Sequence, residues 1–88
     1  DEAGFYDERN SISRYAFTLP EAAHAVGRHI DDLPLQHLNV KLLSVRRHMH
    51  QIQQFDTDFC LEGDDILVVA GHKEKIISFE NWALQGEG

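Results

Sequence analysis

The feature that most constrains the fold is the apolar run from Ile66 to Ala70, which follows a Gly63–Asp64 pair and ends at Gly71. Successive side chains of a strand point to opposite faces of a sheet, and every position here is apolar. Such a strand is typical of the middle of a sheet. The preceding pair predicts a tight turn, in which Gly63 supplies a backbone angle that other residues resist and Asp64 bonds neighbouring backbone amides. The sequence therefore predicts a small β unit that carries no catalytic motif.

The length of 88 residues suits one small domain that buries roughly 60–65% of the surface of its unfolded chain. Such a core leaves little stability to spare, so association with a second copy would help. The longest apolar run is too short for a membrane-spanning helix. A single cysteine, Cys60, excludes an internal disulfide. We therefore expect a cytosolic setting.

The net charge of −7 argues against general binding to nucleic acid polymers or anionic membranes. The charge is unevenly distributed along the chain. Residues 24–54 carry four basic and two acidic side chains, a net of +2, whereas the remainder carries four basic and thirteen acidic ones, a net of −9. Five of the six histidines also lie in the central stretch. An anionic ligand is therefore expected to bind the middle of the chain.

Hydrophobic periodicity predicts an α+β domain. We expect residues 1–13 to form an acidic linker, residues 14–84 the folded domain and residues 85–88 a tail. Within the domain the patterns predict a strand over 14–19, a short helix within 29–38, a strand over 40–47, an exposed hairpin strand within 48–54, the central strand and a helix over 72–83. Pro20 ends the first strand, and Pro34 breaks the first helix, because proline lacks a backbone N–H donor.

Several residues, in order and spacing, resemble the TrkA-C domain, the C-terminal module of regulators of potassium conductance (RCK-C). They are Gly27–Arg28, Ile30, Leu33, Val40 to Arg46, Asp56–Thr57, Leu61, Gly63–Asp64, the apolar run and Gly71. The resemblance spans about residues 14–84. It departs from the family before the Asp–Thr pair, where Gln53, Gln54 and Phe55 replace a usual proline. The final Leu84–Gln85–Gly86 resembles the version attached to potassium-efflux type monovalent cation:proton antiporters.

The resemblance implies a small domain with a mostly antiparallel sheet of about four strands and two helices, which forms a homodimer. It implies a cytoplasmic, non-enzymatic regulator of a K+ or Na+:proton antiporter or potassium transport system. The membrane-embedded transporter would belong to the same polypeptide, with this domain at the inner face of the membrane. In some members the effector is cyclic di-AMP, held between two subunits, so a small anionic effector such as a cyclic dinucleotide is expected. The chain lacks the Gly-rich phosphate loop that binds NAD or ATP.

Five residues are candidates for ligand contact. Arg28 and His29 precede the first predicted helix, where free backbone amides favour anions. Together with Ile30 they belong to the loop that the resemblance places beside the inter-subunit cleft. Arg46 and Arg47 offer planar guanidinium groups suited to phosphate. Strand alternation sends these two arginines to opposite faces, and the alternative for both is pairing with acidic residues between 56 and 62.

Two other interpretations remain open. One is a dimerisation scaffold without a ligand. The other is a sensing module, either for metal, built on His48, His50 and Cys60, or for pH, through the charge change of the six histidines. His48 and His50 share a strand face, but further ligands at a recognised zinc spacing are lacking, so no metal site is predicted. Ser44 and Ser78 lack a nucleophile elbow and Cys60 lacks an activating partner, so no enzyme is predicted.

Overall fold

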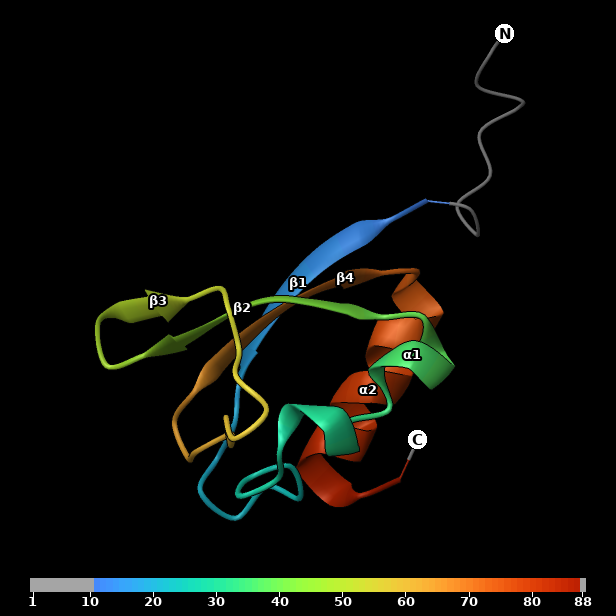
Figure 1. Cartoon of the computed structure of the whole chain (residues 1–88). Coiled ribbons are helices and arrows are strands. Elements are labelled where there is room, and N and C mark those ends of the chain that lie inside the picture. Colours follow the sequence, from blue (N-terminus) through green and yellow to red (C-terminus); the bar gives the residue numbers. More distant parts are fainter. Residues whose placement is uncertain (1–10, 88) are drawn as a thin grey trace, which may run out of the picture.

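Four strands form one antiparallel sheet, and the main helix lies against one of its faces (Figure 1). The computed structural model describes residues 11–87. Its elements are β1 (Ser13–Thr18), the 3-10 turn η3 (Ile30–Asp32), α1 (Leu35–Leu38), β2 (Lys41–Arg47), β3 (His50–Ile52), β4 (Ile66–Gly71) and α2 (Lys73–Gln85). The strand order is β1-β4-β2-β3. The predicted α+β class, with about four antiparallel strands and two helices, is confirmed. Among residues 11–87, no helix is both long and apolar enough to cross a membrane.

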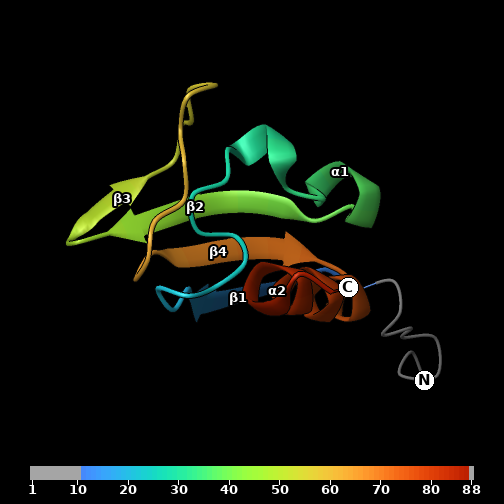
Figure 2. The same cartoon turned by 90° about the horizontal axis from the view of Figure 1, so that it is seen from below.

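Strand β4 is central, as its apolar run predicted, because it pairs with β1 on one side and β2 on the other. Its side chains alternate in burial. Leu67 and Val69 are fully buried, whereas Ile66 and Val68 are partly exposed on the opposite face. No helix within residues 11–87 covers that second face (Figures 1 and 2). The described residues therefore bury one face of the sheet rather than both.

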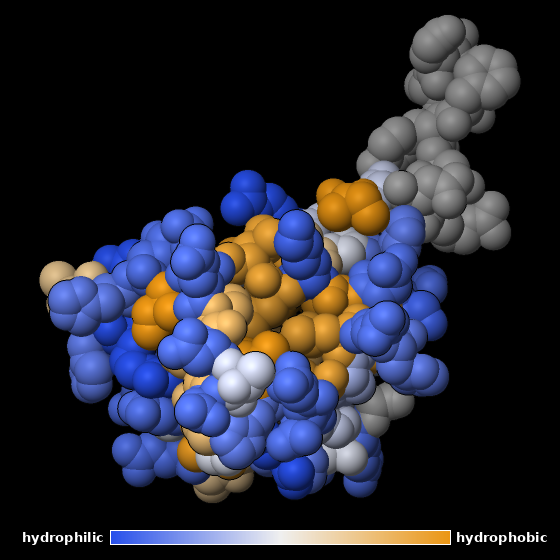
Figure 3. Space-filling model, viewed as in Figure 1, coloured by the Kyte–Doolittle hydropathy of each residue, from blue (hydrophilic) through white to orange (hydrophobic). Residues whose placement is uncertain are grey.

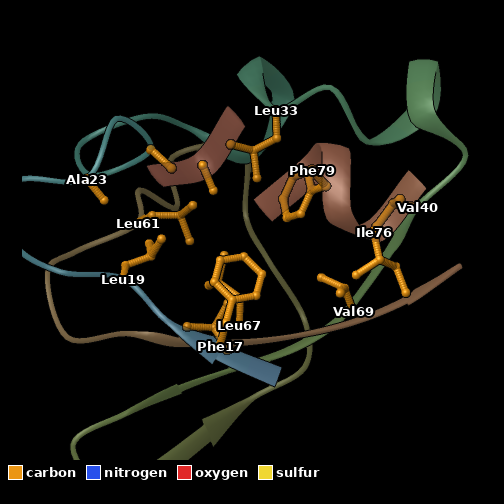
Figure 4. Close-up of a cluster of buried hydrophobic side chains, with 13 residues drawn as sticks. Phe17, Leu19, Ala23, Leu33, Val40, Leu61, Leu67, Val69, Ile76 and Phe79 are labelled. Carbon is orange, nitrogen blue, oxygen red and sulfur yellow. The ribbon is translucent and has the colours of Figure 1, made fainter. Parts of the chain in front are cut away.

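The hydrophobic core lies between the sheet and α2 (Figure 4). Helical spacing brings Ile76, Phe79 and Ala83 to one side of α2, and all three are buried. Phe79 is fully buried, with its ring centroid 6.1 Å from that of Phe17 in an edge-on contact. The core joins β1, β4 and α2 to the loops between them, because residues such as Leu61 also belong to it.

Pro34 separates the first predicted helix into two pieces, as expected. η3 ends at Asp32, and α1 begins directly after Pro34. Asn39 ends α1 in the left-handed conformation, with φ of 57°, and its N–H donates to the carbonyls of Leu35 and Gln36. The short helix therefore turns sharply into β2. Helix α2 runs to Gln85, the first residue of the predicted tail.

The turn before β4 forms, but the prediction gave the wrong physical reasons for it. Asp64, not Gly63, adopts the left-handed conformation, with φ of 71°. Gly63 is needed for space, because a Cβ there would lie 2.7 Å from Cγ and 3.0 Å from Cα of Glu21. The side chain that accepts from a backbone amide is that of Asp65, whose Oδ2 lies 2.8 Å from the nitrogen of Glu62.

We expect Gly63→Ala to lower the free energy of unfolding by about 1–3 kcal/mol, because the new methyl group would force the Glu21 backbone to shift. Asp64→Gly should leave stability unchanged or slightly raised, because glycine adopts positive φ without strain. Urea unfolding of both variants measures the two effects. A loss in Asp64→Gly together with a neutral Gly63→Ala would contradict this description of the turn.

A β-bulge in β2 was not predicted. The register against β4 shifts between Leu42 and Ser44, so Leu43 is an inserted residue. As a result Ser44 and Val45 are both buried, although they are neighbours on a strand. Strand β3 pairs only with residues 45–47 of β2, which leaves the first half of β2 with a free edge among the described elements. This free edge borders the candidate site.

Candidate ligand-binding site

A hollow of about 380 Å³ lies beside the free edge of β2. Its apolar lining consists of Ile30, Leu35, Val40, Leu42 and Phe55, and its polar lining of Gln36, Asn39 and Lys41. In the view of Figure 3, apolar side chains gather in the middle of the molecular face and hydrophilic residues surround them. We refer to the hollow lined by these eight residues as the β2 hollow.

Each wall of the β2 hollow comes from a different segment. The 3-10 turn supplies Ile30, α1 and the residues after it supply the two amides, and the loop after β3 supplies Phe55. The left-handed Asn39 brings α1 close to the start of β2, where Lys41 lies at the exposed rim. Apolar walls can pack against a flat ring, and side-chain amides can form hydrogen bonds with the polar edge of that ring. The ammonium group of Lys41 can attract an anion. The β2 hollow is thus suited to a ligand with a planar ring and a negative charge.

The segment from Phe59 to Leu61 supports two of these walls. The carbonyl of Phe59 accepts from the N–H of Ile30 at 3.3 Å, and the N–H of Leu61 donates to the carbonyl of Arg28 at 3.0 Å. The rings of Phe55 and Phe59 lie 5.0 Å apart. Both the Ile30 wall and the Phe55 wall therefore rest on residues 59–61, which we call the support segment.

Side-chain contacts of Arg47, a residue of β2, connect the support segment to the sheet. Its Nε and one terminal nitrogen each lie 2.8 Å from a carboxylate oxygen of Asp65, and that same terminal nitrogen donates to the carbonyl of Cys60 at 2.9 Å. The guanidinium also lies over the Phe59 ring, 4.8 Å from its centroid. The hydrogen bonds to Asp65, which is fully buried, raise the pKa of Arg47. The guanidinium therefore stays charged at every physiological pH.

The structure brings one of the five predicted ligand residues, Ile30, into the β2 hollow. Its neighbour His29 is exposed, with Nδ1 3.9 Å from a carboxylate oxygen of Asp32. Arg28 bends back instead, because its Nε donates to the carbonyl of His24 at 3.0 Å. The loop predicted to meet an anion therefore offers the β2 hollow an aliphatic side chain.

The two strand arginines have different surroundings. Arg46 is exposed, and its cross-strand partners are Ile66, on the open face of the sheet, and Gln51. Arg47 is largely covered and paired with Asp65, and its other terminal nitrogen lies 3.3 Å from Glu62. Pairing with acids was the stated alternative for these arginines, but Asp65 was not among the acids considered.

The ligand prediction missed seven of the eight residues that line the β2 hollow, among them Gln36, Asn39, Lys41 and Phe55. Two of them carried a signal in the sequence. Lys41 belongs to the basic central stretch, and Phe55 occupies the loop in which the family pattern has a proline. The two amide residues carried none, because their positions depend on how α1 ends.

Within residues 11–87, no three histidine, cysteine or acidic side chains gather into a group that could hold a metal ion. His48 forms the turn between β2 and β3 with φ of 56°, and both His48 and His50 are exposed. Cys60 belongs instead to the support segment, where it forms a β-bridge with His29.

A second hollow of about 350 Å³ lies between β1 and α2. It is mainly apolar, and its lining includes Tyr15, whose hydroxyl donates a hydrogen bond to Oε2 of Glu80 at 3.2 Å. This bond and the negative charge of Glu80 raise the pKa of Tyr15 above its ordinary value.

Tyr15 is expected to ionise at a higher pH than an ordinary tyrosine, whose pKa is about 10. Because the pKa is raised in the folded state, the contact stabilises the fold below about pH 10, and this contribution is lost as the pH rises through the folded pKa. Glu80→Gln should therefore lower the pKa of Tyr15. Absorbance titration in a Tyr6→Phe background isolates Tyr15, because the chain has two tyrosines. An unchanged titration in Glu80→Gln would refute the contact.

Comparison with solved structures finds 33 matching chains. The RCK C domain of the potassium transport protein KtrA, in complex with cyclic di-AMP, superposes with a TM-score of 0.68 and 23% identity, covering 82% of this chain and 84% of that one. The RCK_C domain dimer of S. agalactiae BusR with cyclic di-AMP superposes with a TM-score of 0.65 and 15% identity, covering 82% of this chain and 89% of that one. S. agalactiae BusR bound to its busAB-promotor DNA superposes with a TM-score of 0.65 and 15% identity, but only 35% of that chain is covered.

At these identities the structural matches establish the fold. No functionally curated protein matches the sequence. The family model of the TrkA-C domain, however, matches residues 14–84. This range contains all the strands and α2, except for the first residue of β1 and the last residue of α2, together with all eight residues that line the β2 hollow. The chain therefore belongs to the TrkA-C domain family.

Proposed function

We propose that this chain is an effector-binding regulatory domain of a potassium or other monovalent-cation transport system. The observation that carries the proposal is the β2 hollow, which combines apolar walls, two amides and Lys41 in a member of the TrkA-C family. Two proteins with this fold, KtrA and BusR, have been solved with cyclic di-AMP. The acidic charge of this chain favours a small effector over a nucleic acid polymer.

The proposed effector is a cyclic dinucleotide. Its purine ring would pack on the apolar walls formed by residues such as Leu35 and Phe55. Gln36 and Asn39 offer both donors and acceptors to the polar edge of a base. Lys41 supplies a cation to a phosphodiester at the exposed rim. Each part of the ligand thus has a matching chemical group in the β2 hollow.

The proposed assembly is a homodimer that holds the effector between its subunits. In one copy the β2 hollow measures about 380 Å³ and opens along a strand edge. This volume is near the lower end for small-molecule sites, which run from about 300 to 1,000 Å³. A second copy facing the first would enlarge and close the site. The first half of β2, whose outer edge pairs with no other described strand, offers a further surface for such pairing.

The proposed parent protein is a monovalent cation:proton antiporter of the potassium-efflux type. The resemblance at residues 84–86 supports this assignment. The domain would act on the cytoplasmic face of the membrane, and residues 1–13 would link it to the transporter. An effector would change transport by binding one subunit arrangement more tightly than another, because only a difference in affinity shifts such an equilibrium.

Thermal unfolding with added nucleotides tests the proposal. We expect cyclic di-AMP or a related cyclic dinucleotide to raise the melting temperature with concentration, because a ligand selective for the folded state stabilises it. Lys41→Gln should weaken binding by about tenfold, equivalent to about 1.4 kcal/mol. Lys75→Gln, which removes the same charge from an exposed position of α2, should bind as the wild type does.

Two results would contradict the proposal. A flat response to every cyclic dinucleotide would favour the ligand-free scaffold. An equal rise in the wild type and in Lys41→Gln would place the ligand outside the β2 hollow.

A further inference from the structure

We propose that Arg47 is a positioning residue for the β2 hollow, which shapes the site without contacting the ligand. This inference rests on the proposed function for its ligand, although its structural half can be tested without one. Arg47 lies on β2, yet it is absent from the lining of the hollow. Its effect is transmitted through the support segment, residues 59–61.

The guanidinium of Arg47 is fully engaged within the domain. Its three nitrogens contact both carboxylate oxygens of Asp65, the carbonyl of Cys60 and the carboxylate of Glu62. One face also lies over the ring of Phe59. To bind an anion, Arg47 would have to leave Asp65, whose side chain is only 1% exposed, as an unpaired buried charge. A structural role is therefore favoured over ligand contact.

Two of these contacts lead directly to walls of the β2 hollow. The Phe59 ring contacts both the Arg47 guanidinium and the ring of Phe55. The Phe59 carbonyl also accepts from the N–H of Ile30, and the bridge between His29 and Cys60 continues this pairing. Release of the support segment would thus loosen the aromatic wall and the 3-10 turn together.

Positive charge alone would not perform this role. The fork of the guanidinium bonds Asp65 and Cys60 at once, and its flat face covers the Phe59 ring. Lysine keeps the charge opposite Asp65 but has neither the fork nor the flat face. Phe59→Leu removes the ring from the same contact and leaves every charge in place. The two variants, Arg47→Lys and Phe59→Leu, should therefore have the same effect on the hollow.

The thiol of Cys60 reports on the support segment without any ligand, because it is the only cysteine of the chain. The reaction rate of this partly buried thiol with Ellman's reagent is measured well below the unfolding midpoint of each variant. We expect both Arg47→Lys and Phe59→Leu to raise this rate several-fold. Arg14→Gln, which removes an exposed arginine from β1, should leave it unchanged.

Calorimetry with cyclic di-AMP then tests the consequence for binding. Both variants should weaken binding by about tenfold or more, whereas Arg14→Gln should not. If Arg47→Lys weakens binding while Phe59→Leu binds normally, Arg47 contacts the ligand directly and the inference is wrong. It is also wrong if neither variant changes the labelling rate. If the wild type binds no cyclic dinucleotide, the proposed function fails, and the labelling rates still decide whether Arg47 positions the segment.

Discussion

Arg47→Met is expected to lower the free energy of unfolding by about 3–5 kcal/mol, because it leaves a buried carboxylate without its cation. Asp65 is fully buried, and after the substitution the N–H of Glu62 would be the one hydrogen-bond donor left to its carboxylate within residues 11–87. Small domains have total stabilities of about 5–15 kcal/mol, so a large share of the stability would be lost. Urea unfolding, followed by far-UV circular dichroism, measures the difference.

The double variant Arg47→Met with Asp65→Leu is the matched control. It replaces the buried ion pair by two apolar side chains, and such replacements are often neutral or stabilising. We expect it to recover much of the stability lost in Arg47→Met. The recovery should be incomplete, because Asp65→Leu also removes the hydrogen bond that the N–H of Glu62 donates to Asp65. If Arg47→Met costs less than about 1 kcal/mol, the pair behaves like an exposed salt bridge and our description of it is wrong.

Phe79→Ala is expected to cost about 3–5 kcal/mol, because it leaves a cavity in the centre of the core. Phe79 is fully buried on α2, and its ring lies 6.1 Å from that of Phe17 and 6.2 Å from that of Trp82. Trp82 is the only tryptophan, so its fluorescence during urea unfolding reports on this contact.

Ile77→Ala tests whether burial, rather than loss of any apolar side chain from α2, sets this cost. Ile77 is 49% exposed on the same helix. We expect its truncation to cost less than about 1 kcal/mol, because only part of its surface leaves water on folding. A larger loss in Ile77→Ala than in Phe79→Ala would contradict the packing of α2 shown in Figure 4.

The elements could be predicted where the signal is local. The period of two around Phe17 places β1, and the run from Ile66 places β4 in the middle of the sheet. Spacing of three and four residues on α2 identifies the buried side, with Phe79 at its centre. The break at Pro34 follows from the missing N–H of proline. In each case the neighbours along the chain decide the outcome.

The candidate site depends on contacts between distant residues, which a single sequence does not encode in local patterns. Asp64 and Asp65 are the same residue type, yet one adopts the left-handed turn conformation and the other is the buried partner of Arg47. The inserted Leu43 shifts the alternation of β2 by one residue. The β2 hollow joins walls as far apart as Ile30 and Phe55. Periodicity predicts neither a bulge nor such pairings.

Calorimetric titration of the folded chain with cyclic di-AMP tests the central claim most directly, with sedimentation to follow assembly. The proposed function predicts saturable binding of one ligand per two chains, a dimer in the bound state, and weaker binding in Lys41→Gln but not in Lys75→Gln. Absence of binding to the folded wild type by this or any other cyclic dinucleotide would contradict an effector site in the β2 hollow.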